Sequence, residues 1–333
     1  MSCNSVAKKV MLLGLVVLNL ALSSFAQTHW ARVSLKSEWF YIDSTGKKTL
    51  SCTYTQCSNF SEGLALVKGD KLGYIDPKGK IVVPLKLGNA NPFQEGKAFA
   101  DFGFIDKTGQ PLFKKHRFKK ASNFSEGFAA ATDKGNWGYI NSKGEYEIAQ
   151  KYQQAFPFSE GLALVQKDNA WSYLNVKGKV SFVIKENVIQ ATSFKEGFAT
   201  IKTSKGWGTI DPDGIIVLEP TYANLENIGS GYLKQKIDAQ NENIIRGDGK
   251  VVKSAGSFKE FSEGLVAVKT NGLWGYWDSE LNEIIKPNYE EVGKFVNGLA
   301  PVKKDGLWGY INKKGAFVIP ASFHVAEAFH RID

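Results

Sequence analysis

Short apolar segments bounded by glycine-rich turns recur along most of the chain. Residues 63–68 form an aliphatic run that ends in a lysine, which predicts a strand buried on both faces. Residues 137–141 alternate large and small side chains, as in a second strand, and Gly138 beside Trp137 is expected to leave room for a neighbouring ring. A third strand is predicted over 316–319, where a proline follows and ends the ladder.

Turn residues connect the second and third strands. Residues 76–79 and 211–214 have Asp first, Pro second and Gly fourth, which predicts a type I turn leading into a left-handed glycine. The pair Asp211 and Asp213 also resembles the start of a calcium loop, but the later ligands of such a loop are missing, so a plain hairpin turn is favoured. Each unit therefore reads as about three short strands.

Two marks show that these units are internal repeats, returning every 31 to 36 residues. The first mark is Phe-Ser-Glu-Gly, and its defining residues are Phe60, Glu62, Gly63, Phe124, Glu126, Gly127, Phe158, Glu160, Gly161, Phe261, Glu263 and Gly264. The second mark follows about 12 residues later and is centred on Trp137-Gly138, Trp207-Gly208, Trp274-Gly275 and Trp308-Gly309. An aromatic residue also lies six positions before many of the Phe marks, as in the pair Phe323 and Phe329. The copy around 228–257 is the most degenerate and has lost its Trp.

Such units must stack on one another, because three short strands cannot bury enough apolar surface alone. About nine units exceed the usual propeller count of about 4–8 blades, and some thirty residues are few for a four-stranded blade. We therefore predict an all-β fold, a tandem array of about nine three-stranded antiparallel β-hairpin repeats that form an open β-solenoid or superhelix. The alternative is a closed ring resembling a β-propeller.

On these Trp-Gly-Tyr-Ile-Asp and Phe-Ser-Glu-Gly segments, the chain resembles the bacterial WG-repeat proteins over roughly residues 30 to 333. The resemblance implies a repetitive β architecture, found mostly on exported or envelope-associated proteins. It implies no common enzymatic activity and no shared site.

The N-terminus predicts export. Lys8 and Lys9 precede a short apolar run, and Ser24 and Ala26 place small residues before a cut at Gln27, so residues 1–26 read as a cleaved secretory signal peptide and 27–333 as the repeat domain. A periplasmic or extracellular location follows, with no transmembrane span in the mature chain. Its net charge becomes 9 − 2 = +7, but the basic residues are scattered rather than gathered on one face, which argues against nucleic-acid binding.

Candidate chemistry is sparse. No metalloprotease, phosphate-loop or nucleophile-elbow motif occurs, so we predict no catalytic residues, no metal site and no cofactor, and hence no enzyme. The repeated glutamates could hold cations, but pairing with lysines such as Lys68 or Lys202, or with backbone amides, is favoured. Cys52 and Cys57 could form a disulfide only if the chain turns between them, and the sequence leaves this open.

The predicted function is a binding or scaffold surface for a protein partner in the envelope or outside the cell. A first alternative is a glycan-binding module in which repeat rings stack on sugars, with Trp137, Trp171, Trp207, Trp274 and Trp308 as the candidates. An aromatic spine inside the fold competes with that interpretation. A cryptic hydrolase, whose site would be assembled only in space, is a second and disfavoured alternative.

Overall fold

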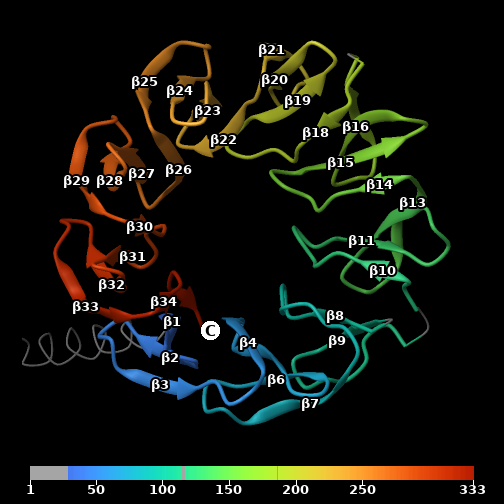
Figure 1. Cartoon of the computed structure of the whole chain (residues 1–333). Coiled ribbons are helices and arrows are strands. Elements are labelled where there is room, and N and C mark those ends of the chain that lie inside the picture. Colours follow the sequence, from blue (N-terminus) through green and yellow to red (C-terminus); the bar gives the residue numbers. More distant parts are fainter. Residues whose placement is uncertain (1–28, 102, 115–116, 186) are drawn as a thin grey trace, which may run out of the picture.

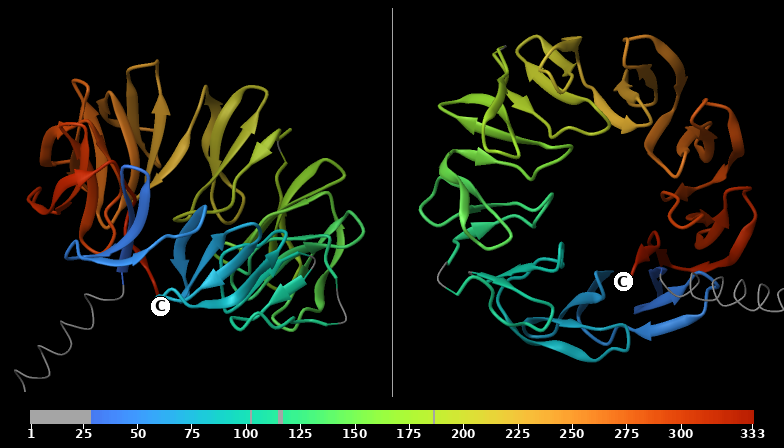
Figure 2. Two further views of the ribbon diagram at one scale, coloured as in Figure 1. Left: turned by 60° about the horizontal axis from the view of Figure 1, so that its bottom comes forward. Right: turned by 180° about the vertical axis from the view of Figure 1, so that it is seen from behind.

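The computed structural model describes residues 29–101, 103–114, 117–185 and 187–333, which consist of strands and turns arranged as a ring (Figures 1 and 2). The predicted signal peptide lies outside the described residues. Nine antiparallel sheets follow one another around the ring, and eight of them have four or five strands. We number these sheets as blades 1 to 9 in chain order.

Blades 1 to 4 occupy the N-terminal part of the ring. Blade 1 contains β1 (His29–Leu35), β2 (Glu38–Asp43), β3 (Lys48–Ser51), β34 (Val325–Ala326) and β35 (His330–Arg331). Blade 2 contains β4 (Gln56–Ser61), β5 (Leu64–Lys68), β6 (Leu72–Ile75) and β7 (Ile81–Leu87), and blade 3 contains β8 (Ala98–Ala100) and β9 (Gly103–Ile105). Blade 4 contains β10 (Lys120–Ala121), β11 (Ala129–Thr132), β12 (Trp137–Ile140) and β13 (Tyr146–Tyr152).

Blades 5 to 9 complete the ring, each with four strands. Blade 5 contains β14 (Gln154–Ala155), β15 (Leu162–Lys167), β16 (Ala170–Asn175) and β17 (Val180–Val183), and blade 6 contains β18 (Gln190–Ala191), β19 (Ala199–Thr203), β20 (Gly206–Ile210) and β21 (Ile216–Tyr222). Blade 7 contains β22 (Glu226–Gly229), β23 (Tyr232–Lys236), β24 (Glu242–Arg246) and β25 (Val251–Ala255). Blade 8 contains β26 (Ser257–Ser262), β27 (Leu265–Thr270), β28 (Leu273–Asp278) and β29 (Glu283–Tyr289), and blade 9 contains β30 (Glu291–Val292), β31 (Leu299–Lys304), β32 (Leu307–Asn312) and β33 (Phe317–Phe323).

The repeat unit is four-stranded, so the predicted three-stranded unit was wrong. The missed strand is the first of each four-stranded blade, and in blades 4, 5, 6 and 9 it has only two residues. Such a strand is too short for any alternation of apolar and polar residues to be read from the sequence. It comes directly before the Phe-Ser-Glu-Gly turn and pairs with the aliphatic strand, as Ala121 does with Ala131.

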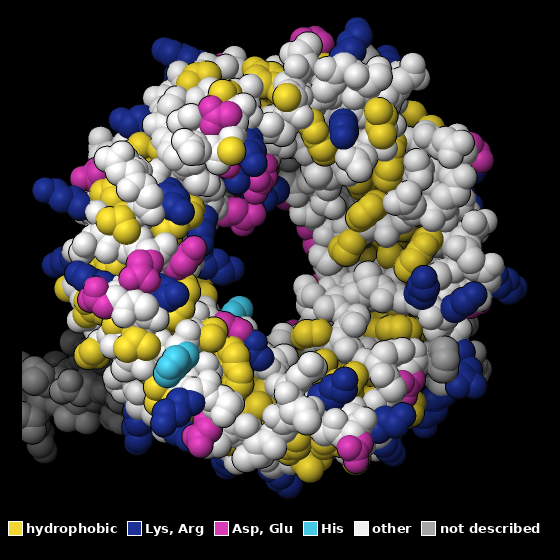
Figure 3. Space-filling model, viewed as in Figure 1, with side chains coloured by type: hydrophobic (Ala, Val, Ile, Leu, Met, Phe, Trp, Pro, Cys, Tyr) yellow, Lys and Arg dark blue, Asp and Glu magenta, His cyan; other side chains and the backbone are white. Residues whose placement is uncertain are grey.

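The ring is closed, so the predicted open solenoid was wrong and the closed, propeller-like alternative was right. Near the C-terminus, β34 and β35 pair antiparallel with β1, with Val33 opposite Ala326 and Trp30 opposite His330. Blade 1 starts without a first strand of its own, and the end of the chain supplies it. Figure 3 shows that the ring surrounds a central opening.

Aromatic pairs join successive blades. The Tyr of each Trp-Gly-Tyr segment packs against the Phe mark of the next blade, with ring centroids 5.1 Å apart for Tyr139 and Phe158 and 4.8 Å apart for Tyr276 and Phe295. These rings are buried and meet edge to face, an arrangement that adds favourable electrostatics to apolar burial. The predicted aromatic interior is therefore present, and it lies between blades.

The glycine of the Trp-Gly mark has a different role from the one predicted. A Cβ on Gly138 would lie 2.4 Å from the carbonyl oxygen of Ile148, and one on Gly275 would lie 2.3 Å from that of Ile285. The same close approach occurs at Gly208 and Gly309. The space beside the Trp is thus filled by the backbone of the outer strand, which bulges at this point, and not by a neighbouring ring.

Candidate functional site

The Phe-Ser-Glu-Gly mark forms a two-residue hairpin. Glu126 and Gly127 have φ angles of 53° and 82°, and Ser125 and Phe128 exchange backbone hydrogen bonds on either side of them. Positive φ at both central residues is the type I′ geometry that suits the twist of a β-hairpin. Gly takes this conformation without strain, whereas the Glu must be held in it by its surroundings.

The glutamate carboxylates reach from one blade to the next. Each accepts a hydrogen bond from the backbone N–H of the Gly in the following mark, and the pairs are Glu62 with Gly96, Glu95 with Gly127, Glu126 with Gly161, Glu160 with Gly197, Glu196 with Gly231, and Glu263 with Gly298. These contacts hold the left-handed glutamates in place. The expectation that they accept backbone amides is therefore correct.

The lysine partners are not the predicted ones. Glu62 pairs with Lys107 at 3.5 Å and Glu263 with Lys313 at 3.1 Å, whereas Lys202 lies over the ring of Trp207. Over the described ranges, no group of three or more His, Cys, Asp or Glu side chains lies close enough together to hold a metal ion. The glutamates act as links between neighbouring turns.

Two hydroxyl groups add further links between blades. The Ser of the mark donates to the backbone carbonyl of the next Phe mark, as Ser125 does to Phe158 at 2.8 Å. The Tyr of the Trp-Gly mark donates to the first strand of the next blade or to the residue after it, as Tyr139 does to the Phe156 carbonyl at 2.7 Å. Burial raises the pKa of the Tyr139 hydroxyl well above its usual value, so the donor stays protonated.

These contacts account for the remaining marked residues. Phe60, Phe124 and Phe158 are buried among rings, and Phe261 stacks on Tyr232 instead of on a Tyr of the Trp-Gly strand. The mark glycines Gly63, Gly161 and Gly264 have positive φ. The repeat signature is thus used to build the ring.

The five candidate stacking tryptophans are packed within the blades. Trp171 and Trp274 are only 5% and 6% exposed, and Trp137, Trp207 and Trp308 are half-buried. The indole N–H groups of Trp171 and Trp274 are buried without an acceptor, which costs roughly 1–3 kcal/mol each. A continuous groove of open rings is therefore absent from the described part of the chain.

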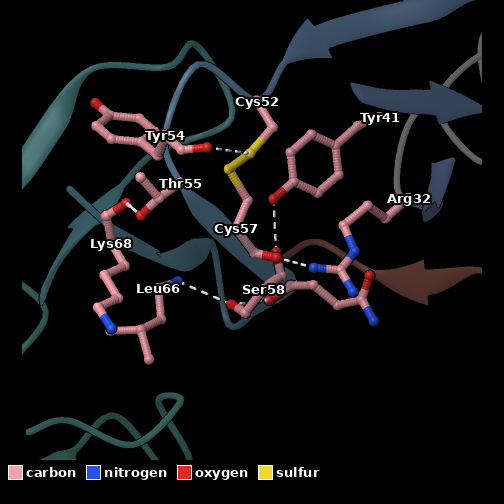
Figure 4. Close-up of a disulfide and its surroundings, with 10 residues drawn as sticks. Arg32, Tyr41, Cys52, Tyr54, Thr55, Cys57, Ser58, Leu66 and Lys68 are labelled. Atoms are coloured by element: carbon pink, nitrogen blue, oxygen red, sulfur yellow. Dashed lines mark hydrogen bonds between the residues drawn. A yellow bond between two sulfur atoms is a disulfide. The ribbon is translucent and has the colours of Figure 1, made fainter. Parts of the chain in front are cut away.

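A pocket of about 990 Å³ opens between blades 1 and 2, and the Cys52–Cys57 disulfide lies in its wall (Figure 4). The two Cα atoms are 6.2 Å apart, since the chain turns between β3 and β4. Trp39, Tyr54 and Lys68 also line the pocket. Its mixture of aromatic, charged and hydroxyl groups suits binding of polar ligands or peptide segments.

Arg32 lies beside this pocket at the point where the ring closes. Its guanidinium donates to the backbone carbonyl of Cys57, pairs with Glu327 after β34, and stacks 4.7 Å from the centroid of Trp39. Glu327 also accepts a hydrogen bond from Asn59 at 3.0 Å. Sequence reasoning missed this cluster, because nothing in the sequence relates Arg32 to a residue 295 positions later.

The closed ring of repeated antiparallel blades places the chain among the β-propeller-like proteins. The family model for the WG containing repeat matches residues 39–71, 73–100, 102–137, 137–171, 256–274, 274–308 and 308–331. The chain belongs to this WG-repeat family. Blades 6 and 7 lie outside the matched segments, yet they have the same strand order as blades 2, 4, 5, 8 and 9.

Several solved structures match the chain at low sequence identity, and one of them has a TM-score above 0.5. A eukaryotic initiation factor has a TM-score of 0.58 at 10% identity, covering 90% of this chain and 98% of that one. The dihydro-heme d1 dehydrogenase NirN has a TM-score of 0.49 at 12% identity, with coverages of 92% and 75%. BamB from Moraxella catarrhalis has a TM-score of 0.43 at 11% identity, with coverages of 75% and 88%. At such identities the similarity concerns the fold alone.

The search of curated proteins finds no relative of this chain by sequence. Within the described ranges, no helix has the length and apolar character needed to cross a bilayer.

Proposed function

We propose that this protein is an exported, non-catalytic scaffold whose ring binds an extended segment of a protein partner. Two features support this. The signature residues are used for contacts between blades, and the outer strands of the blades present sheet edges on the circumference of the ring (Figure 1). A sheet edge binds an extended peptide through backbone hydrogen bonds, with side-chain contacts adding specificity.

The observation that carries the proposal is the composition of β17, the outer strand of blade 5. It contains neither a charged residue nor a proline, whereas the outer strands β7, β13, β21, β25, β29 and β33 each contain at least one. Charges and prolines are the usual protection of an exposed edge against pairing. On β17, Val180 and Val183 are instead 52% and 50% exposed.

Exposed aliphatic side chains extend this edge toward blade 6. Val176 precedes β17, Ile189 lies in the connection to β18, and Ile215 and Val217 lie at β21 of the next blade. Scattered single apolar residues need no explanation, but a run around an unprotected edge is typical of a protein interface. The partner is therefore expected to contribute a strand with apolar side chains.

The test compares capture by three baits, namely the purified wild-type protein, the double variant V180K/V183K and the control V251K. Val251 is also exposed on an outer strand, but β25 already contains Lys253. Proteins captured from an envelope extract by the wild type and V251K should be lost with V180K/V183K. Equal capture by all three baits would contradict the proposed edge.

Export requires its own measurement. Cell fractionation should place the protein outside the cytoplasm, and N-terminal sequencing should begin at Gln27. Retention in the cytoplasm with an intact N-terminus would contradict this part of the proposal.

A further inference from the structure

At the junction of blades 7 and 8, the strand β24 of blade 7 lacks both the Trp and the Tyr of the Trp-Gly mark. Glu242 takes the Trp position of blade 7, because it pairs with Ala255 as Trp274 pairs with Tyr289 in blade 8. Ile244 takes the position of the buried Tyr. A pocket of about 780 Å³ lies at this junction, lined by the β23–β24 hairpin, the β25–β26 connection and the β27–β28 hairpin.

Glu242 is held in a defined position at one wall of the pocket. Its Oε2 accepts hydrogen bonds from the backbone N–H of Phe258 at 2.7 Å and from the Ser257 hydroxyl at 3.0 Å, so the carboxylate is anchored to blade 8. No donor within the described residues binds its Oε1. The junction thus contains a fixed carboxylate with one oxygen free to accept from a ligand.

The pocket lining also contains donors. The Lys269 ammonium lies 5.6 Å from the centroid of the Trp274 ring and forms no ion pair within the described part of the chain. The Trp274 indole N–H is buried and has no acceptor there. Both residues line the pocket, together with the amide side chains of Asn241 and Asn271.

We propose that this pocket binds a saccharide that carries a carboxylate group, such as a uronic acid unit. Lys269 pairs with the ligand carboxylate, since an ammonium and a carboxylate form a strong charge-assisted hydrogen bond. Glu242 accepts from sugar hydroxyls, and the amide and hydroxyl groups of the rim satisfy the remaining polar atoms.

The arrangement of charges selects among ligands. Glu242 and Asp238 line the same pocket as Lys269 and Lys236, so the pocket is balanced in charge and offers a highly charged polyanion such as a polyphosphate no net attraction. A single carboxylate can reach Lys269, while the hydroxyls of the same ligand face Glu242. This site is independent of the proposed β17 edge, and its failure would leave that proposal standing.

The binding test uses isothermal titration calorimetry of the purified protein with trigalacturonate. Maltotriose is the neutral control saccharide, and glutarate is the control for a carboxylate without a sugar. E242W restores the repeat residue and removes the carboxylate, and K269M removes the ammonium. K303M is the matched control, because Lys303 pairs with Trp308 in blade 9 as Lys269 pairs with Trp274 in blade 8. Blade 8, which precedes blade 9, keeps its Trp, whereas blade 7, which precedes blade 8, has Glu242 in that position.

Trigalacturonate should bind the wild type and K303M equally, while E242W should abolish binding and K269M should weaken it by about tenfold or more. K269M keeps the proposal testable if E242W does not fold. No binding of trigalacturonate at millimolar concentration, or unchanged affinity in K269M, would overturn the assignment. Equal binding of maltotriose would show that the carboxylate is not recognised. Equal binding of glutarate would show that the sugar is not recognised.

Discussion

The carboxylate of Glu263 accepts a hydrogen bond from the backbone N–H of Gly298, 3.0 Å away and 35 residues further along the chain. Its second oxygen accepts from the N–H of Asn297 at 2.6 Å, and Lys313 pairs at 3.1 Å with the oxygen that accepts from Gly298. One side chain of blade 8 therefore holds the equivalent turn of blade 9. The same link recurs around the ring, so it couples the stability of each blade to that of its neighbour.

Loss of this link should depend on pH. Burial alone would raise the pKa of Glu263, but hydrogen bonds from Gly298 and Lys313 outweigh it and hold the pKa below its ordinary value of 4.5. The carboxylate therefore stabilises the fold above the unfolded-state pKa, and this contribution is lost as pH falls through the lower, folded-state pKa. Urea unfolding between pH 7 and pH 3 should show a smaller loss of stability for E263Q than for the wild type. A parallel decline of the two proteins would argue against the link.

The glycine of the Trp-Gly mark should tolerate no side chain. Since a Cβ on Gly275 would lie 2.3 Å from the Ile285 carbonyl oxygen, G275A must displace the outer strand and should lower the free energy of unfolding by about 1–3 kcal/mol. Gly103 holds the equivalent position in blade 3 and has no atom within 4 Å of its added Cβ. G103A should therefore change stability little. Chemical denaturation of both variants checks the contrast, which equal effects would refute.

Ring closure predicts that the last Phe is as important as one in the middle of the chain. Phe329 is fully buried against Tyr310, with ring centroids 5.0 Å apart, as Phe158 is against Tyr139. F329A and F158A should each cost about 3–5 kcal/mol of stability. In an open array the terminal residue would pack on one side only, so a small effect of F329A in thermal or urea unfolding would argue for an open chain end.

The disulfide should stabilise the wall between blades 1 and 2. Cys52 and Cys57 close a short loop, for which the chain-entropy model gives roughly 2 kcal/mol. The variant C52S/C57S should lose about this much in urea unfolding, and a reductant should destabilise the wild type but leave the variant unchanged. Alkylation of both thiols in the native protein without prior reduction would contradict the bond.

Local chemistry made much of the blade predictable. Asp76 forms the predicted turn, with its carboxylate accepting from the backbone N–H groups of Lys78 and Lys80, because such bonds span only a few residues. The aliphatic and Trp-Gly strands and the aromatic contacts of marked residues such as Phe158 follow from residue pattern in the same way.

Only the tertiary structure decided how the units meet. The sequence by itself determined the repeat, its turns and its aromatic interior, but it did not determine the angle between successive blades. These angles add up around the nine sheets and bring β34 next to β1. The contacts of Arg32 with Glu327 and of Glu242 with Phe258 are likewise set by packing between strands that no local pattern connects. Hydrogen bonds within a turn depend on neighbouring residues, whereas closure and the pockets depend on the summed geometry of the whole ring.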